Sequence, residues 1–181
     1  MSFTKKIKEL EELNKKLKPI PEDLPGRFFP EGYEKRFDFI FLALRPSMNV
    51  PENWDGISNF NFDADTAPDN FFKKMLIKYG VAGNYVTDMV KKRAPAKQRP
   101  TREEVIEYLP FLIKEIEIIK PKAIIFIGKE VERIFWQYLK PCTLKEIRVD
   151  WVWHYSQQGS KTNREVMERF QEVIGKFSNL K

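Results

Sequence analysis

Four short apolar runs that alternate with segments of helical periodicity limit the folds open to this chain more than any other feature. The runs are residues 37–44, 84–90, 122–128 and 147–153. They are rich in β-branched and aromatic residues and are too short for buried helices. Strands that alternate with helices pair in parallel through right-handed crossovers. We therefore expect an α/β fold, a three-layer α/β/α sandwich around a central, mainly parallel sheet of about four strands.

Five segments beside these runs have the signals of helices. They are residues 3–18, 70–79, 101–119, 129–139 and 162–177. Residues 101–104, Thr-Arg-Glu-Glu, form a capping box at the start of the third segment. Asp69 is expected to cap the second helix and Gly80 to end it. Pro110 should kink the third helix or mark a junction in it.

The N-terminal region combines an amphipathic helix with a proline-rich segment. The first helix can pack on the domain surface, which we favour, or bind a partner. We expect one domain, residues 1–181, with the helix and the proline-rich lead-in as residues 1–36. The first 18 residues are charged throughout, which fits neither a signal peptide nor a membrane span. We therefore expect a cytoplasmic protein that does not bind membranes.

Composition excludes some chemistry. Only one cysteine, Cys142, and one histidine are present. An internal disulfide is impossible, and we expect no metal site, no iron–sulfur cluster and no other cofactor. The 32 basic and 26 acidic side chains leave a formal net charge of +6. This excess is compatible with a polyanionic partner but does not establish one.

Polar clusters follow the expected strands. They are Arg45–Ser47, Asp88, Gly128–Lys129 and His154–Ser156. In an open parallel sheet, ligands bind outside the carboxyl ends of the strands. We therefore expect these clusters to converge on one edge and to form the site.

In this order, the motifs resemble the uracil-DNA glycosylase superfamily. "IFLALRPS" is similar to the first motif of that family, and "PDNFFKKMLIKYG" with "NYVTDMVKKR" is similar to its next helix and strand. "YLPFLIKEIEIIKPKAIIFIGKEV" resembles its helix–strand segment, and "HYS" stands in place of His-Pro-Ser. The resemblance covers about residues 35–177. It implies the same sandwich fold and an activity that extrudes a damaged base and cleaves its glycosidic bond.

The resemblance assigns roles to the last cluster. His154 would hydrogen-bond the base carbonyl and support the leaving anion, although a lone histidine is usually a satisfied polar group. Ser156 would contact a phosphate. Tyr155 replaces the usual proline, so the local turn can differ from that of the family.

Arg45 stands where relatives carry a small polar residue that orients or activates water. An arginine cannot act as a general base, because its pKa is above about 12. Three interpretations remain open. Arg45 can place positive charge on the base anion or on a phosphate, it can mark the loss of hydrolysis, or it can pair with an acid of the following loop, Asp55, Asp63 or Asp65.

Asp88 aligns with the base-reading position of the family, which is often Asn. An ionised Asp only accepts hydrogen bonds, so it suits a base that presents amino or imino hydrogens; a protonated Asp can serve uracil. A structural role is equally open, as a strand-end cap or a partner of Lys91 or Lys92.

The long loop after the first strand supplies further candidates. Phe60 is the favoured base-stacking ring, with Phe62 as the alternative, and both can instead anchor the loop to the core. Asn49 or Asp55 can position water.

The basic segment 91–102 lies after the second strand. We expect Lys91, Lys92 and Arg93, together with Ser47 and Ser156, to contact a nucleic-acid backbone; a solvated loop is the alternative. Residues 155–164 contain no Leu, Met or Phe that could act as a wedge, which favours single-stranded DNA or damaged duplex as the partner.

Three functions remain open. The first is a nucleobase DNA glycosylase that acts on uracil or another deaminated or mismatched base. The second is a non-hydrolytic nucleic-acid- or nucleotide-binding protein that keeps the fold. The third is an enzyme that acts on a free nucleotide or nucleoside.

Overall fold

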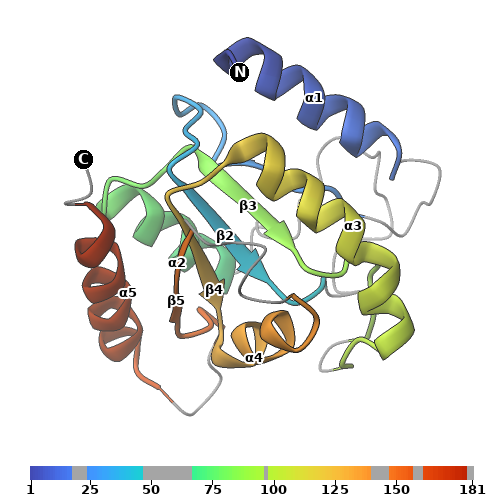
Figure 1. Cartoon of the computed structure of the whole chain (residues 1–181). Helices are drawn as coiled ribbons and strands as arrows, with labels where there is room; N and C mark the ends of the chain where they lie inside the picture. The colour runs from blue at the N-terminus through green and yellow to red at the C-terminus, as the bar shows by residue number, and fades with distance from the viewer. Residues whose placement is uncertain (18–23, 47–66, 96–97, 140–146, 157–160, 179–181) are drawn as a thin grey trace.

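The structure is a computed structural model of the whole chain. It describes all residues except 18–23, 47–66, 96–97, 140–146, 157–160 and 179–181. Within the described part, helices cover both faces of one central sheet (Figure 1). The expected α/β/α sandwich is therefore confirmed.

The sheet has five strands, one more than the sequence predicts. The strands are β1 (Arg27–Phe29), β2 (Phe39–Ala43), β3 (Asn84–Asp88), β4 (Ala123–Ile127) and β5 (Arg148–Val152). Their order is β1-β3-β2-β4-β5. β2, β3, β4 and β5 are parallel, as expected, whereas β1 pairs antiparallel with β3. β1 escaped prediction because it has three residues and follows a run of prolines.

Burial explains the sequence pattern of the strands. All residues of β2, β3 and β4 are buried, because helices cover both faces of these strands. β5 lies at the edge and is largely half-buried, with only Val152 fully inside. β5 can therefore carry Arg148 and Asp150, whose side chains are in part open to solvent.

The helices form the outer layers. They are α1 (Phe3–Lys15), α2 (Ala67–Lys78), α3 (Arg102–Ile119), α4 (Lys129–Tyr138) and α5 (Asn163–Ser178). α1, α3 and α4 pack on one hydrophobic core cluster, and α2 and α5 pack on another, across the sheet from the first. α1 lies beside α3 (Figure 1), so packing on the domain is the observed role of its apolar face.

Local signals at the helix ends are mostly as predicted. The Thr101–Glu104 capping box is present, with both reciprocal hydrogen bonds. Gly80 follows α2 with a φ of 68°, a conformation that glycine adopts without strain. Pro110 lies inside α3, which is assigned as one continuous helix. The expected cap at Asp69 is wrong: α2 begins at Ala67, and Asp69 is a buried residue of its first turn.

The register brings the carboxyl ends of the parallel strands to one edge. Ala43 lies opposite Asp88, and Ile127 lies opposite Val152. Main-chain pairing continues beyond the strands, since the Met89 N–H donates to the Ala43 carbonyl at 2.9 Å. The segments that follow β2 and β3 therefore leave the sheet side by side.

None of the described helices is long and apolar enough to cross a lipid bilayer.

Candidate active site

His154 lies directly after β5, and its hydrogen bonds define its protonation. The main-chain N–H of Ser156 donates to His154 Nδ1 at 3.2 Å, and the Ser156 hydroxyl lies 2.8 Å from the same nitrogen. A main-chain N–H can only donate, so Nδ1 is the acceptor and carries no proton. We therefore assign the proton of the neutral ring to Nε2.

Burial supports the neutral form of this ring. It lowers the pKa of His154 from 6.5 to about 4, because a charged imidazolium is poorly solvated there. At neutral pH the side chain is thus an uncharged donor through Nε2–H. Such a group can hydrogen-bond a carbonyl oxygen and can stabilise negative charge that develops on it.

Two aromatic rings stack in line with this imidazole. Tyr155 stacks on His154 with ring centroids 4.7 Å apart, and Phe72 from α2 stacks on Tyr155 at 4.8 Å. The stack joins the end of β5 to α2, on the side of the sheet where α5 also packs. It holds the plane of the imidazole, since a tilted imidazole would lose its stacking contact with Tyr155.

Two buried carboxylates act on Tyr155. Burial, the charges of Asp69 and Asp88, and a hydrogen bond with Asp69 all raise the pKa of the Tyr155 phenol. Asp88 ends β3 and Asp69 belongs to α2, and both side chains are buried. The described structure thus brings Asp88, predicted to read the base, close enough to the residue after His154 for their electrostatic interaction.

Lys91 does not lie on the surface. Its ammonium is fully buried and pairs with Glu115 of α3 at 2.7 Å. It also donates to the Thr87 hydroxyl and to the Asp88 main-chain carbonyl, the latter at 2.8 Å. A cation held in this way cannot reach a phosphate, so the predicted contact of Lys91 with a nucleic-acid backbone is wrong. The contact of its ammonium with Asp88 is made through the main chain.

The ion pair of Lys91 belongs to a larger polar network. Glu115 also accepts from the hydroxyls of Tyr85 and Thr87, both at 3.1 Å. A buried carboxylate is stable only when its oxygens are satisfied, and here three donors satisfy them. The network thereby fixes the last part of β3, on which Asp88 stands.

Arg45 forms a fork-shaped ion pair with Glu104. Its Nη1 and Nη2 each lie 3.1 Å from a different oxygen of that carboxylate, and Nη2 also donates to the Lys92 carbonyl at 3.3 Å. Only 6% of the Arg45 side chain is exposed. Burial opposes ionisation of Glu104, but the hydrogen bonds from Arg45 and the Thr101 main chain outweigh it and lower the Glu104 pKa.

The partner of Arg45 is therefore an acid of α3. The loop acids considered from the sequence, Asp55, Asp63 and Asp65, lie outside the described residues. The guanidinium joins the exit of β2 to the capping box of α3. In this state both terminal nitrogens of the guanidinium donate to groups of the protein itself, Glu104 and the Lys92 carbonyl.

The other predicted site residues divide into two groups. Lys92 and Arg93 are half-buried, and burial lowers the pKa of Arg93. Ser47, Asn49, Asp55, Phe60 and the alternative ring Phe62 lie outside the described residues. Ser156, predicted to contact a phosphate, is hydrogen-bonded to His154.

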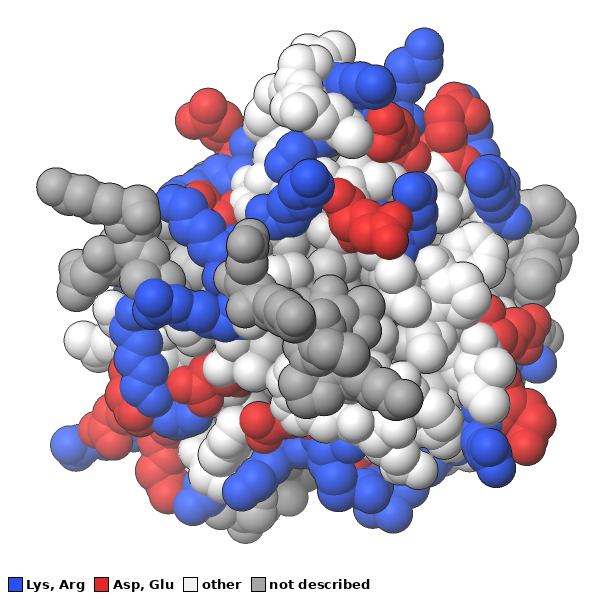
Figure 2. All heavy atoms as spheres, viewed as in Figure 1, with Lys and Arg blue, Asp and Glu red and all other residues white. Residues whose placement is uncertain are grey.

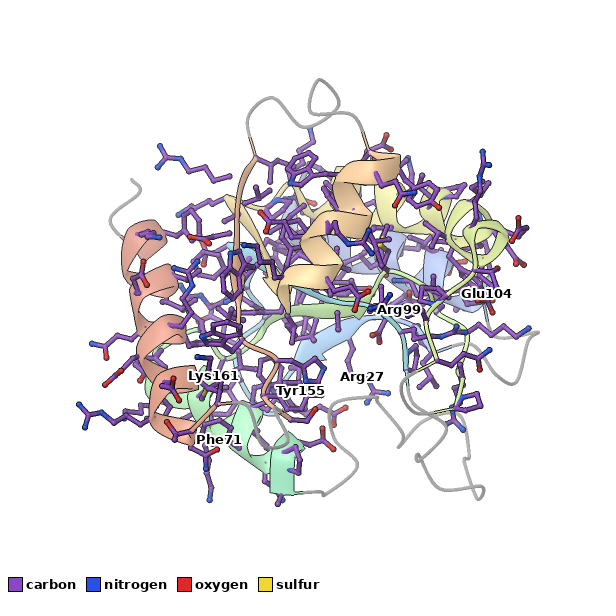
Figure 3. The ribbon with its side chains drawn as sticks, turned by 90° about the horizontal axis from the view of Figure 1, so that it is seen from below. Arg27, Phe71, Arg99, Glu104, Tyr155 and Lys161 are labelled. Atoms are coloured by element: carbon purple, nitrogen blue, oxygen red, sulfur yellow. The ribbon has the colours of Figure 1, made fainter. Side chains whose placement is uncertain are left out.

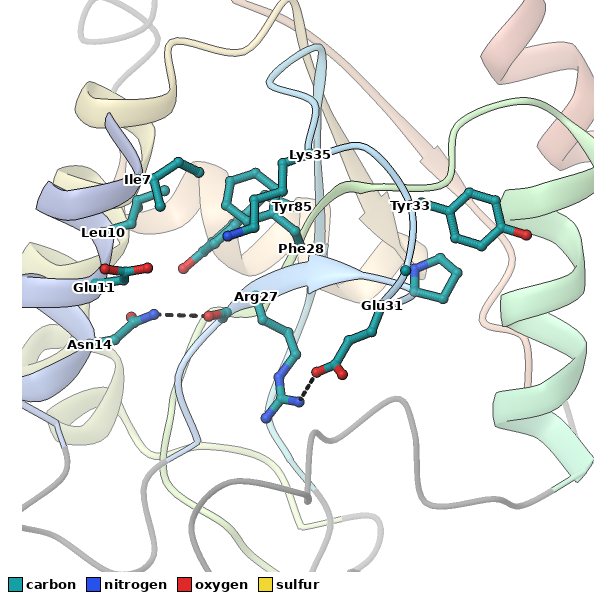
Figure 4. A pocket seen from close by; sticks show the side chains of 13 residues that line it. Ile7, Leu10, Glu11, Asn14, Arg27, Phe28, Glu31, Tyr33, Lys35 and Tyr85 are labelled. Carbon is teal, nitrogen blue, oxygen red and sulfur yellow. Dashed lines mark hydrogen bonds and ion pairs between the residues drawn. The ribbon is translucent and has the colours of Figure 1, made fainter. Parts of the chain in front are cut away.

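A separate cavity of about 580 Å³ lies between α1 and β1, at the opposite edge of the sheet from β5 (Figure 4). It is lined by apolar side chains such as Ile7 and Phe28 and by charged ones such as Arg27, which pairs with Glu31 at 3.2 Å. None of the predicted site residues that the structure describes lines it. No cluster of three or more His, Cys, Asp or Glu side chains suited to a metal ion occurs in the described ranges.

Comparisons with known proteins identify the family. The profile of the uracil DNA glycosylase superfamily matches residues 32–175. The chain belongs to the uracil DNA glycosylase superfamily. The expected resemblance is thus confirmed, and the matched range contains β2, β3, β4 and β5 with the helices between them.

Two curated relatives of this uracil DNA glycosylase superfamily member come from Pyrobaculum aerophilum. A type-4 uracil-DNA glycosylase is 48% identical over 44 residues, which are 24% of this chain and 22% of the relative. A type-5 uracil-DNA glycosylase is 28% identical over 137 residues, with 62% of this chain and 60% of the relative covered. The matches span less than two thirds of the length of either relative.

Sequence reasoning missed several residues of this superfamily member that surround His154 and Arg45. In the sequence, Asp69 is interpreted as a helix cap and Glu104 as half of a capping box. Tyr155 is interpreted only as a departure from the family motif. Phe72 had no signal beyond an apolar position of a helix. An acid such as Asp69 in the first turn of a helix that packs beside the strand ends is the one signal that could have pointed to the site.

Proposed function

We propose that the protein excises a deaminated or mismatched base from DNA by hydrolysing the N-glycosidic bond. The observation that carries this proposal is the neutral His154, which accepts from Ser156 at Nδ1 and therefore has Nε2–H as its donor. A fixed, uncharged donor suits a base that leaves as an anion.

Cleavage would break the bond between the base nitrogen and the sugar carbon, with the electron pair passing to the base. The Nε2–H of His154 would donate to a carbonyl oxygen on which this charge accumulates. Water would then add to the sugar cation and lose a proton. Asn49 and Asp55 are the candidates for positioning that water, and Phe60 is the candidate for stacking on the base.

Asp88 would select the base. An ionised carboxylate accepts hydrogen bonds from amino or imino hydrogens and repels the O4 carbonyl of uracil. Substitution Asp88→Asn supplies an amide that donates and accepts, so we expect it to shift relative excision toward uracil by about tenfold. Ser47, Lys92, Arg93 and Ser156 would contact the backbone beside the flipped nucleotide.

The test is a strand-cleavage assay with oligonucleotides that carry uracil, hypoxanthine, xanthine or a mismatch. We expect an abasic product on at least one substrate and a loss of about 10²–10³-fold in His154→Ala. His154→Gln retains a donor and should lose less. Absence of product on every substrate, with the fold intact by circular dichroism and with binding retained, would contradict hydrolysis.

A second candidate function is a binding protein that keeps the fold without hydrolysis. The ion pair of Arg45 with Glu104 favours it, because the residue in the first motif cannot serve as a base and is engaged elsewhere. The double variant Arg45→Asn/Glu104→Gln removes both charges together. Excision that appears or rises in this variant supports a converted site; excision that disappears indicates that the wild-type pair serves catalysis.

A further inference from the structure

We propose that an aromatic and basic strip at the β5 edge binds single-stranded DNA next to the candidate active site. The proposal takes DNA as the ligand from the proposed function, and the strip itself is defined by contacts between described side chains. Its members are Arg99, Lys129, Arg133, Trp151, Trp153 and Lys161.

The basic end of the strip is a shallow depression of about 590 Å³ at the start of α4. Three cations and one acid, Arg99, Lys129, Arg133 and Glu130, line it. Glu130 is shared, since it lies 2.9 Å from Arg99 and 3.6 Å from Arg133. Two arginines on one carboxylate leave a net positive depression, which suits a phosphate.

The aromatic end of the strip, Trp151 and Trp153, adjoins the basic end through Lys129. Lys129 lies over the Trp151 ring, 5.6 Å from its centroid, and Trp151 meets Trp153 edge to face at 4.7 Å. Lys161 lies over Trp153 at 5.0 Å. The strip therefore passes from cation to ring to ring to cation, and Trp153 directly precedes His154.

The position of β5 leaves these rings accessible. β5 is the edge strand, and both tryptophans are half-buried rather than enclosed in the core. The arrowheads of β2 and β3 point downward in Figure 1, and Figure 3 shows the molecule from that lower side. In Figure 3, Lys161 and Arg99 lie to either side of Tyr155. In this view the two ends of the strip therefore lie on opposite sides of Tyr155, the residue after His154.

Rings interleaved with cations suit unpaired nucleotides. Every base has a π-face that can stack on tryptophan, whereas bases in a duplex are already stacked on one another. A lysine over a partly exposed ring binds it less tightly than a stacked base does. An incoming base can therefore displace Lys161 from Trp153, and its flexible ammonium then remains near the adjacent phosphate. The Trp151 ring is also covered by Arg169, 4.7 Å from its centroid and paired with Asp150, so Trp153 is the stacking ring of the strip.

This local pattern differs from the rest of the surface in view. Figure 2 shows Lys and Arg interleaved with Asp and Glu over that face, without a large region of one sign. On this face the two signs of charge are mixed, so charge alone does not define a DNA path there. Contacts among rings and cations define one instead.

The experiment measures binding of the full chain to undamaged oligothymidylate of about twelve nucleotides, by fluorescence anisotropy at several salt concentrations. The test variant is Arg99→Gln/Lys129→Gln/Arg133→Gln. Its matched control is Lys5→Gln/Lys8→Gln/Lys16→Gln, which removes three cations from another shallow depression, on α1, whose described lining contains no aromatic ring. We expect the test variant to weaken binding by about 10–100-fold and to reduce the salt slope by about 2, with less than about twofold change in the control.

A second variant tests the rings. Trp153→Leu should weaken binding of the single strand by about tenfold and leave binding of a duplex of equal length within about twofold. Equal losses in the test and control triple variants, or unchanged single-strand affinity in both Trp153→Leu and the test triple variant, would overturn the proposal. Equal losses on both DNA forms in Trp153→Leu would also contradict it, in favour of duplex binding.

The oligonucleotide carries no base to excise, so the outcome is independent of the glycosylase proposal. If His154→Ala abolishes excision but binds normally while the triple variant loses binding, both proposals stand. If no substrate is excised and the triple variant still loses binding, only the excision proposal fails.

Discussion

The strand ends of β2 and β3 differ from the end of β5 in how they handle charge. After β2 and β3, the cations Arg45 and Lys91 are buried and paired with carboxylates of α3. After β5, the half-buried ring is the neutral His154, held by a main-chain N–H and an aromatic stack. The first two ends thus satisfy their cations within the protein, whereas the third carries an uncharged donor, which serves the ligand in the proposed function.

The largest effect should come from breaking the buried pair at β3. Lys91→Met leaves the Glu115 carboxylate buried without its cation, so we expect a loss of about 3–5 kcal/mol in the free energy of unfolding, measured with urea. The double variant Lys91→Met/Glu115→Leu should recover more than half of that loss. The matched control is Lys114→Met, which breaks the exposed pair with Glu117 on the same helix and should cost less than about 0.5 kcal/mol.

A loss in Lys91→Met no larger than that of Lys114→Met would mean that the β3 end is not held by charge. The contrast with β5 would then disappear.

The next largest effect is the loss of stability at low pH that His154, at the end of β5, should cause. Above about pH 6.5, His154 is neutral in the folded and unfolded states and does not make stability depend on pH. Between pH 6.5 and about pH 4, His154 is protonated in the unfolded chain but stays neutral in the folded protein. The free energy of unfolding therefore falls as the pH falls. We expect about 2–3 kcal/mol of this loss to be absent in His154→Gln, when the unfolding of both proteins is compared at pH 7 and pH 4.

NMR tests the same assignment directly. His154 is the sole histidine of the chain, so its imidazole signals need no assignment. Their midpoint should lie near pH 4. A midpoint at pH 6 or above would show that the ring is solvated, and the neutral-donor role would lose its basis.

A smaller effect is expected at the β2 end. Glu104→Gln keeps the side-chain oxygen of the capping box but removes the charge that faces Arg45, so we expect a loss of about 1–2 kcal/mol. Glu103→Gln, an exposed acid of the same first turn, is the control and should cost about 0.5 kcal/mol or less. If the two variants unfold at the same urea concentration, the fork-shaped pair does not hold the exit of β2.

The smallest effect concerns the turn between β4 and α4. Gly128 has a φ of 103°, where a side chain is strained, so Gly128→Ala should cost about 1 kcal/mol although its Cβ would meet His154 only at 3.9 Å. Gly175→Ala is the control, since this α5 residue has open space around it and should become slightly more stable. Thermal melts that rank the two variants the other way would contradict the strain at this turn.

Much of the fold follows from short-range patterns. The apolar runs predicted four of the five strands, and the Thr101–Glu104 motif predicted the start of α3. Parallel order then brought the polar strand ends to one edge, as the sequence had indicated. These features depend on neighbours a few residues apart, and the sequence displays those neighbours directly.

The sequence by itself determined the alternation of strands and helices, the capped helix and the edge at which polar residues meet. Only the tertiary structure decided that Arg45 pairs with Glu104, 59 residues away, and that Lys91 is buried with Glu115, 24 residues away. A charged side chain looks the same in a sequence whether it faces water or a carboxylate. Its partner is chosen by the packing of α3 on the sheet, because burial makes an unpaired charge far more costly than a paired one.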